Sequence, residues 1–130
     1  MTNGNYTKPT ILIAREKLGD DSDLAGLMLN NNIDLVRVES GNEALLALQT
    51  NPAISLAMIN ADLPGLNGFD TALEIRKLSP GIPIILLVNY VNAVSIRLSI
   101  LTDCTRMLQN PIDPLDLDTI VEQCLISFCN

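Results

Sequence analysis

The stretch of residues 54–68, ISLAMINADLPGLNG, decides the fold that this sequence predicts. It starts with an uncharged and mostly apolar run that ends at Asn60, and a loop with one proline and two glycines follows. An apolar run closed by turn residues is typical of a strand buried on both faces of a parallel sheet. Ligands collect at the carboxyl ends of such strands. We therefore expect a site in the loop that follows Ile59.

Four further apolar runs alternate with helical patterns on either side of this stretch. They cover residues 10–14, 33–38, 83–88 and 104–108. Strands that are each followed by a helix predict an α/β protein with a parallel sheet and right-handed crossovers. For five strands we expect the order 2-1-3-4-5, the flavodoxin-like doubly wound arrangement with three α/β/α layers. Residues 1–9 are expected to form a flexible segment, and residues 10–130 a single domain.

Capping signals and apolar spacing define the expected helices. Ser40 and Glu43 have the spacing of a capping box. Asp113 followed by Pro114 is typical of a helix start, and the acidic residues of segment 20–23 are N-cap candidates for the first helix. The positions expected to face the core are Leu24, Leu27 and Met28 in the first helix, Ala44, Leu45 and Leu48 in the second, Phe69, Ala72 and Leu73 in the third, Val91, Val94, Leu98 and Leu101 in the fourth, and Leu117, Ile120, Val121, Cys124 and Phe128 in the last.

The composition fits one globular domain and excludes several classes of protein. Hydrophobic residues make up 48% of the 130 residues, yet no apolar run is long enough to span a membrane. The first residues lack the apolar core of a signal peptide, so a cytoplasmic location is expected. The net charge of −7 argues against nucleic acid as the main partner. The absence of histidine excludes His-based triads and most zinc sites. Cys104, Cys124 and Cys129 lack metal-site spacing and are expected to be reduced thiols.

Several landmarks of the sequence resemble the receiver domains of two-component response regulators. Residues 11–14 resemble the first strand of that family, and residues 40–45, SGNEAL, resemble the start of its second helix. Residues 63–69, LPGLNGF, resemble its most recognisable loop, and residues 83–85 and 110–111 match later landmarks. The resemblance covers nearly all of the chain. It implies the flavodoxin-like fold and a role in bacterial phosphorelay signalling. It also implies a cis peptide bond between Asn110 and Pro111 rather than an ordinary trans turn.

The resemblance also implies where the phosphorylation site of the family falls in this chain. The aspartate that accepts the phosphoryl group corresponds to Asn60, whose neutral amide is too weak a nucleophile for this chemistry. The two acidic metal ligands that follow the first strand correspond to Arg15 and Glu16. The hydroxyl residue that senses the phosphate corresponds to Val88, the lysine before the proline to Asn110, and the aromatic switch residue to Met107.

These substitutions predict a pocket that has lost both Mg²⁺ and the phosphoryl group, with no cofactor in their place. Mg²⁺ needs oxygen ligands, and only Glu16 remains of three family carboxylates. Arg15 is expected to repel the cation, to pair with Glu16 or Asp62, and so to take over the structural role of the metal. Asn60 either holds its loop by hydrogen bonds or merely packs there. Asp62 is expected to be a solvated loop residue rather than a displaced phosphoacceptor.

Three isoleucines are candidates for an interaction surface. Ile96 and Ile100 lie about 200° round the fourth helix from the positions expected to face the core. Ile126 lies off the core face of the last helix. Such residues can form an apolar patch. The resemblance implies that the face of the fourth helix, fifth strand and fifth helix dimerises or binds an effector, so we expect a homodimer or a protein partner there.

The function expected from these observations is that of a degenerate receiver, or pseudo-receiver. It is expected to be a phosphorylation-independent protein-interaction module and not an enzyme. The alternative is an atypical phosphorelay receiver that still switches through an aspartyl phosphate or a bound anion. A small flavodoxin-like enzyme or nucleotide binder is disfavoured, because no glycine-rich phosphate-binding spacing is present. Since Val88 and Met107 replace the hydroxyl–aromatic pair of the family, one conformational state is expected to dominate.

Overall fold

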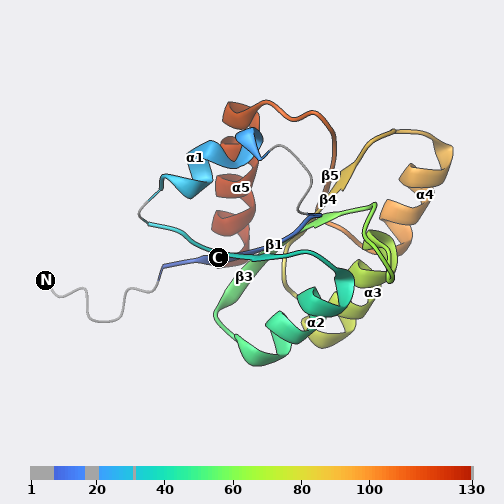
Figure 1. The fold of residues 1–130 in the computed structure, drawn as a ribbon, viewed down its shortest axis with the longest axis horizontal. Helices are drawn as coiled ribbons and strands as arrows, with labels where there is room; N and C mark the ends of the chain where they lie inside the picture. The colour runs from blue at the N-terminus through green and yellow to red at the C-terminus, as the bar shows by residue number, and fades with distance from the viewer. Residues whose placement is uncertain (1–7, 17–20, 31, 130) are drawn as a thin grey trace, which may run out of the picture.

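The structure is a computed structural model that describes residues 8–16, 21–30 and 32–129, with side chains as far as residue 126. Residues 1–7 of the segment expected to be flexible lie outside the described residues. A sheet of five parallel strands runs through the centre in the order β2-β1-β3-β4-β5 (Figure 1). The strands are β1 (Thr10–Ala14), β2 (Asp34–Val38), β3 (Ile54–Asn60), β4 (Ile84–Val88) and β5 (Arg106–Gln109). The predicted flavodoxin-like order is confirmed.

Helices cover both faces of this sheet (Figure 1). They are η1 (Ser22–Leu24), α1 (Ala25–Met28), α2 (Gly41–Thr50), α3 (Gly68–Leu78), α4 (Ala93–Leu101) and α5 (Pro114–Cys129). One apolar core holds side chains of α1 and α5, and the other holds side chains of α2 and α3. The central strand β3 supplies Leu56 and Met58 to the first core and Ala57 and Ile59 to the second. Its apolar run is unbroken because both of its faces are buried, and each large side chain buried in this way stabilises the fold by about 2 kcal/mol.

The starts of α2 and α5 follow their capping signals. Ser40 caps α2, because its Oγ accepts a hydrogen bond from the backbone N–H of Glu43 at 3.1 Å. Asp113 accepts a hydrogen bond from the backbone N–H of Leu115 at 2.8 Å, and α5 begins at Pro114. Both predicted helix starts are confirmed.

The first helix is shorter than predicted and is not capped by its acidic residues. It consists of one 3-10 turn and one α-turn, and the Asp21 side chain makes no capping hydrogen bond. Asp20 lies outside the described residues. Leu24 and Leu27 are buried as expected, but Met28 is 62% exposed, because so short a helix turns few positions toward α5. In the third helix, the expected core residue Leu73 is likewise at the surface.

Helix α4 turns toward the sheet a face that the sequence pattern does not predict. Ser95 and Thr102 are buried, whereas Val94 and Leu101 are 63% and 64% exposed. A capping box between Asn92 and Ser95 fixes the start of the helix. The apolar side chains therefore face outward, and no residue of α4 belongs to either core. Of the positions expected to face the core, Val91, Val94, Leu98 and Leu101, only Leu98 is not exposed.

The C-terminal elements agree with the predicted pattern in most respects. Strand β5 begins at Arg106, two residues later than expected. The core face of α5 consists of buried Leu117, Val121 and Cys124 with half-buried Ile120, while the side chains of Phe128 and Cys129 lie outside the described residues. Cys104 is half-buried, and it and Cys124 are free thiols. Across the part of the chain that the structure describes, no helix has the length and hydrophobicity to cross a bilayer.

Candidate functional site

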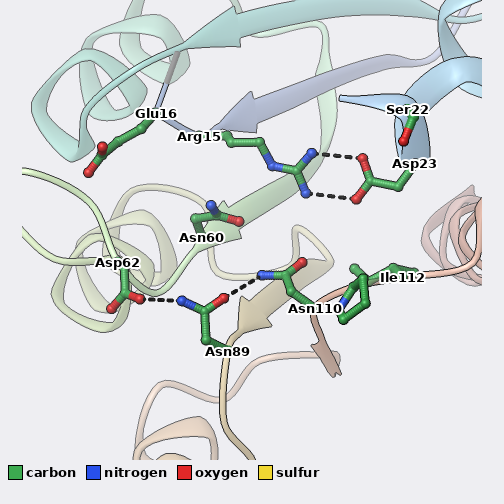
Figure 2. A pocket seen from close by; sticks show the side chains of 10 residues that line it. Arg15, Glu16, Ser22, Asp23, Asn60, Asp62, Asn89, Asn110 and Ile112 are labelled. Atoms are coloured by element: carbon green, nitrogen blue, oxygen red, sulfur yellow. Dashed lines mark hydrogen bonds and ion pairs between the residues drawn. The ribbon is translucent and has the colours of Figure 1, made fainter. Parts of the chain in front are cut away.

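A cavity of about 600 Å³ opens at the carboxyl ends of the central strands (Figure 2). Charged and amide side chains make up most of its wall. The lining residues are Arg15, Glu16, Ser22, Asp23, Asn60, Asp62, Asn89, Asn110, Pro111 and Ile112. Because parallel strands end at one edge of the sheet, residues far apart in the sequence meet there. The predicted site residues Arg15, Glu16, Asn60 and Asn110 all lie in this wall.

Arg15 is the buried cation of the cavity, with only 5% of the residue exposed. Its Nη1 and Nη2 donate to the two carboxylate oxygens of Asp23 at 2.8 and 3.0 Å, and Nη1 also reaches Asp21 at 3.3 Å. The expected pairing with Glu16 or Asp62 is wrong. In Figure 2 the guanidinium points across the cavity to Asp23, away from both of those carboxylates. Arg15 therefore makes a bidentate ion pair with a residue of η1, the geometry in which arginine binds carboxylates best.

The ion pair keeps Arg15 charged in spite of its burial. Burial by itself would lower the pKa of the Arg15 guanidinium. The hydrogen bonds and negative charges of Asp23 and Asp21 outweigh that effect, so the pKa lies above its ordinary value. Arg15 is thus held in its protonated form by its two acidic neighbours.

Arg37 of β2 extends this ion pair into a network of four charges. Its Nη1 contacts the second carboxylate oxygen of Asp21. Its Nη2 donates to the backbone oxygens of Glu16 and Arg15 at 2.9 and 3.3 Å. The two arginines and the two aspartates, Asp21 and Asp23, balance one another. This network ties the end of β1 to β2 and to η1.

Asn60 ends β3 beside this network. Its side-chain Oδ1 is buried and has no hydrogen-bond partner among the described residues. The loop after β3 is held by the backbone instead, with Ala61 N–H donating to Leu87 O at 2.8 Å and Gly68 N–H to Ala61 O at 2.9 Å. Of the two roles considered for Asn60, side-chain hydrogen bonding of the loop is therefore not observed.

A chain of side-chain hydrogen bonds crosses the opposite wall of the cavity (Figure 2). Asn89 Nδ2 donates to Asp62 Oδ2 at 2.7 Å, and Asn110 Nδ2 donates to Asn89 Oδ1 at 3.2 Å. We call Asp62, Asn89 and Asn110 the amide bridge. It joins the loops that follow β3, β4 and β5. The peptide bond between Asn110 and Pro111, at one end of the bridge, is cis as expected.

The remaining predicted residues lie away from the cavity wall. Val88 is buried in β4 and lines a separate cavity of about 160 Å³. Met107 of β5 is half-buried and packs against the core of α2 and α3. Ile96, Ile100 and Ile126 are 45%, 72% and 54% exposed. These three positions are therefore accessible from solution.

Sequence reasoning misses four residues of the site, namely Asp21, Asp23, Arg37 and Asn89. Asn89 directly follows the end of β4, so the rule that points to Asn60 at the end of β3 applies to it equally. The two aspartates look like helix caps in the sequence, and only the tertiary structure brings them to Arg15. Among the described residues, no group of three or more His, Cys, Asp or Glu side chains is close enough together to hold a metal ion.

The sequence is similar to one known protein but to no family model. No protein-family model matches the sequence. A 14.6 kDa protein in the sodA1 3′ region of Leptolyngbya boryana is 26% identical over 111 residues, which cover 84% of this chain and 85% of that protein.

Solved receiver domains superpose on nearly the whole chain. The signal receiver domain of an HD domain-containing protein from Pseudomonas fluorescens has a TM-score of 0.85 at 23% identity, over 94% of this chain and 98% of its own. A CheY-like response regulator receiver domain protein from Methanospirillum hungatei has a TM-score of 0.84 at 21% identity, over 94% and 97%. NtrX from Brucella abortus has a TM-score of 0.81 at 19% identity, and the match covers 94% of this chain but only 28% of NtrX. The fold is that of CheY-like receiver domains.

Proposed function

We propose that this protein is a receiver-fold signalling module that works without phosphoryl transfer and without Mg²⁺. It is a pseudo-receiver and not an enzyme, it acts in the cytoplasm, and it signals through contacts with other proteins. The observation that carries this proposal is the bidentate pair of buried Arg15 with Asp23. A guanidinium at the end of β1 repels a divalent cation. It also supplies the positive charge that such a cation would otherwise bring to the acidic wall.

Asn60 supports the same proposal from the other side of the cavity. A side-chain amide carries no negative charge and does not attack phosphorus as a carboxylate does. Glu16 and Asp62 are the carboxylates of the wall that Arg15 does not bind, and Asp62 accepts a hydrogen bond from Asn89. Mg²⁺ in proteins takes one or two carboxylates together with waters and phosphate oxygens. Here Asp62 is already engaged by Asn89, and buried Arg15 brings a positive charge to the same wall, which disfavours a divalent cation.

An NMR titration with Mg²⁺ and beryllofluoride tests the loss of phosphoryl chemistry. We expect no specific shift of the amide resonances of Asn60, Glu16 or Val88. Mass spectrometry after incubation with acetyl phosphate is expected to show no acid-labile gain in the mass of the protein. The double variant Arg15→Asp with Asn60→Asp restores carboxylates at both strand ends, and it serves as the matched control that is expected to gain a response to Mg²⁺. Specific shifts or an acid-labile gain in the native protein would support the atypical phosphorelay receiver instead.

The proposed contact surface is the outward side of α4 with the loop before it. Tyr90, Val94, Ile100 and Leu101 are 74%, 63%, 72% and 64% exposed, and Ile96 is 45% exposed. Ile96 and Ile100 lie on one flank of the outward side of α4, and Val94 and Leu101 lie on the other flank. Exposed apolar residues gathered on one element are typical of protein interfaces. The occupant is a second copy of the chain or an effector protein, and Ile126 of α5, which is 54% exposed, is a further candidate for the interface.

Light scattering of a charged variant tests this surface. Ile96→Glu with Ile100→Glu places two carboxylates on α4 and is expected to abolish self-association or the capture of the partner. Leu46→Glu is the matched control, because Leu46 of α2 is 60% exposed but lies on another helix. An unchanged mass and unchanged partner capture in the α4 variant would remove the support for this interface.

A further inference from the structure

The cavity at the carboxyl ends of the strands is large enough to hold a small organic molecule. Its volume of about 600 Å³ lies within the range of about 300 to 1,000 Å³ that is usual for ligand sites. Most of the lining side chains are charged or carry amides, but Pro111 and Ile112 add an apolar section. In Figure 2, Asn60 lies between the carboxylates of Glu16 and Asp62 on one side and Ile112 on the other. The cavity therefore has an end with two carboxylates and an apolar end.

Three donor side chains of the wall are already engaged within the protein. Both terminal nitrogens of Arg15 donate to Asp23. The amide nitrogen of Asn110 donates to Asn89, and the amide nitrogen of Asn89 donates to Asp62. An anion that entered the cavity would have to break one of these bonds to use its donor. The charge of Arg15 is also compensated by the Asp23 carboxylate, so this wall attracts a negative group only weakly.

Three acceptors of the same wall have no donor. Oδ1 of Asn60 is buried and unpartnered among the described residues. Asn89 donates to one carboxylate oxygen of Asp62, and the other oxygen is left over. Glu16 is exposed, and within the part of the chain that the structure describes only its backbone oxygen is bonded, to Arg37. Because a buried acceptor without a donor is unfavourable, a ligand that brings a donor to Asn60 gains from satisfying it.

We propose that this cavity binds a small organic cation, namely an ammonium or guanidinium group on an apolar body. Such a group has only hydrogen-bond donors, so it matches the free acceptors of Asn60, Glu16 and Asp62. Its positive charge compensates the two carboxylates that Arg15 does not bind. The apolar body packs against the section formed by Pro111 and Ile112.

An organic cation suits this wall better than a metal ion does. Mg²⁺ must gather several oxygens at about 2.1 Å. A group with several N–H donors reaches acceptors on different loops, each at about 2.9 Å. Buried Arg15 also opposes a single positive charge less than a double one. The inference rests on the proposed function, since it assigns a ligand to a cavity from which phosphoryl chemistry has been lost.

An NMR titration with two probes of opposite charge tests the inference. Benzylammonium carries a cationic donor group on an aromatic ring, and benzoate carries a carboxylate on the same ring. We expect benzylammonium to cause saturable shifts of the Asn60 side-chain amide and of the backbone amides of Asp62 and Ile112. Benzoate is expected to cause none. The inference is wrong if benzylammonium causes no saturable shift of these resonances, or if benzoate binds as tightly.

Three variants locate the binding site. Asn60→Leu keeps the size of the side chain but removes the buried acceptor, and it is expected to weaken benzylammonium binding about tenfold. Glu16→Gln removes an exposed carboxylate of the wall and is expected to weaken it about threefold. Glu122→Gln is the matched control, because Glu122 is an exposed carboxylate of α5 outside the cavity wall, and it is expected to leave the affinity unchanged.

The comparison of the two glutamate variants keeps the test available should Asn60→Leu fail to fold, since Glu16 lies at the surface. Equal losses of affinity in Glu16→Gln and Glu122→Gln would show that benzylammonium responds only to the net charge of the protein, and the inference would then be wrong. Native affinity in a folded Asn60→Leu would contradict it as well. The titrations contain neither Mg²⁺ nor a phosphodonor, so their failure is distinguishable from a failure of the proposed function.

Discussion

Arg15 is a buried cation whose charge is balanced by neighbouring carboxylates. Placing a charge in a protein interior is unfavourable unless partners with good geometry satisfy it. Asp23 accepts hydrogen bonds from both terminal nitrogens of Arg15, and Asp21 contacts both Arg15 and Arg37. The two arginines and two aspartates together carry no net charge. The wall of the cavity is therefore stabilised by the protein's own side chains.

Removing the Arg15 side chain is expected to destabilise the protein strongly. Arg15→Ala leaves the Asp23 carboxylate, whose side chain is only 12% exposed, without its partner. Breaking such a pair costs about 3 kcal/mol. Urea unfolding of the native protein and the variant measures the difference in the free energy of unfolding.

The double variant Arg15→Ala with Asp23→Ala serves as its control. Because it removes both charges, it is expected to lose less stability than the sum of the two single variants. A double variant that loses the full sum would show that the stabilisation comes from packing and not from the ion pair.

The free thiols predict how stability changes in alkaline solution. Burial raises the pKa of Cys104 and of Cys124 above the ordinary value of 9.0. The unfolded chain therefore releases these protons at lower pH than the folded protein does. Their contribution is fully present below about pH 9 and is lost as the pH rises through the folded pKa values. We expect the free energy of unfolding to fall for this reason as the pH rises from about 9 through the folded pKa values.

Urea unfolding of Cys104→Ala with Cys124→Ala isolates the thiol contribution, since lysine and tyrosine titrate in the same range. The double variant is expected to show a shallower decline over this interval than the native protein. Parallel declines would contradict the assignment to the two thiols.

At the level of elements, α3 begins where the backbone leaves no room for a side chain. A Cβ on Gly68 would overlap the backbone oxygen of Asn60 and lie 2.6 Å from Ala61 Cα. The first turn of α3 thus packs directly on the end of β3. This close approach holds the loop that carries Asp62 against the sheet, and the Asn67 side chain caps the helix by accepting from the Asp70 backbone N–H at 2.9 Å.

Gly68→Ala is expected to lower the free energy of unfolding by about 2 kcal/mol, because the backbone itself must move. Thermal or urea unfolding measures this loss. Gly81→Ala is the matched control: a Cβ at Gly81 meets nothing within 4 Å, so that variant is expected to be neutral or slightly stabilising. Equal stabilities of the two variants would contradict the close packing at Gly68.

At the level of the whole molecule, the sheet gathers a site from segments far apart in the sequence. The cavity takes Arg15 from the end of β1, Asn60 from β3, Asn89 from the segment after β4 and Asn110 from the segment after β5. The chain around this site is acidic, with 15 Asp and Glu against 8 Lys and Arg. Like charges on a compact molecule repel one another and oppose folding.

Salt is therefore expected to stabilise the protein. Raising the ionic strength from about 0.01 M to about 0.15 M shortens the screening length from roughly 30 Å to roughly 8 Å. The free energy of unfolding in urea is expected to rise over this range. Glu122→Gln removes one exposed negative charge of α5 and is expected to weaken the response. A fall in stability with salt would instead show that attractive pairs dominate the electrostatics of the fold.

The sequence by itself determined the architecture. Its apolar runs, their alternation with helices and the capping residues Ser40 and Asp113 predict the strand order and the helix starts that the structure has. They also predict that Arg15, Glu16 and Asn60 meet at one edge of the sheet, and the resemblance to receiver domains adds Asn110. These features follow from local periodicity and from chain connectivity, which a sequence contains in full.

Only the tertiary structure decided which side chains pair and which way α4 faces. Arg15 has several carboxylates within reach along the chain, and the position of η1 selects Asp23. Apolar residues are spread so evenly round the nine residues of α4 that spacing cannot identify a buried face, and in the structure the buried position is Ser95. Asn89 becomes the centre of the amide bridge because three loops converge there. Such choices depend on distances between segments remote in sequence, which are set when the sheet assembles and not by any local pattern.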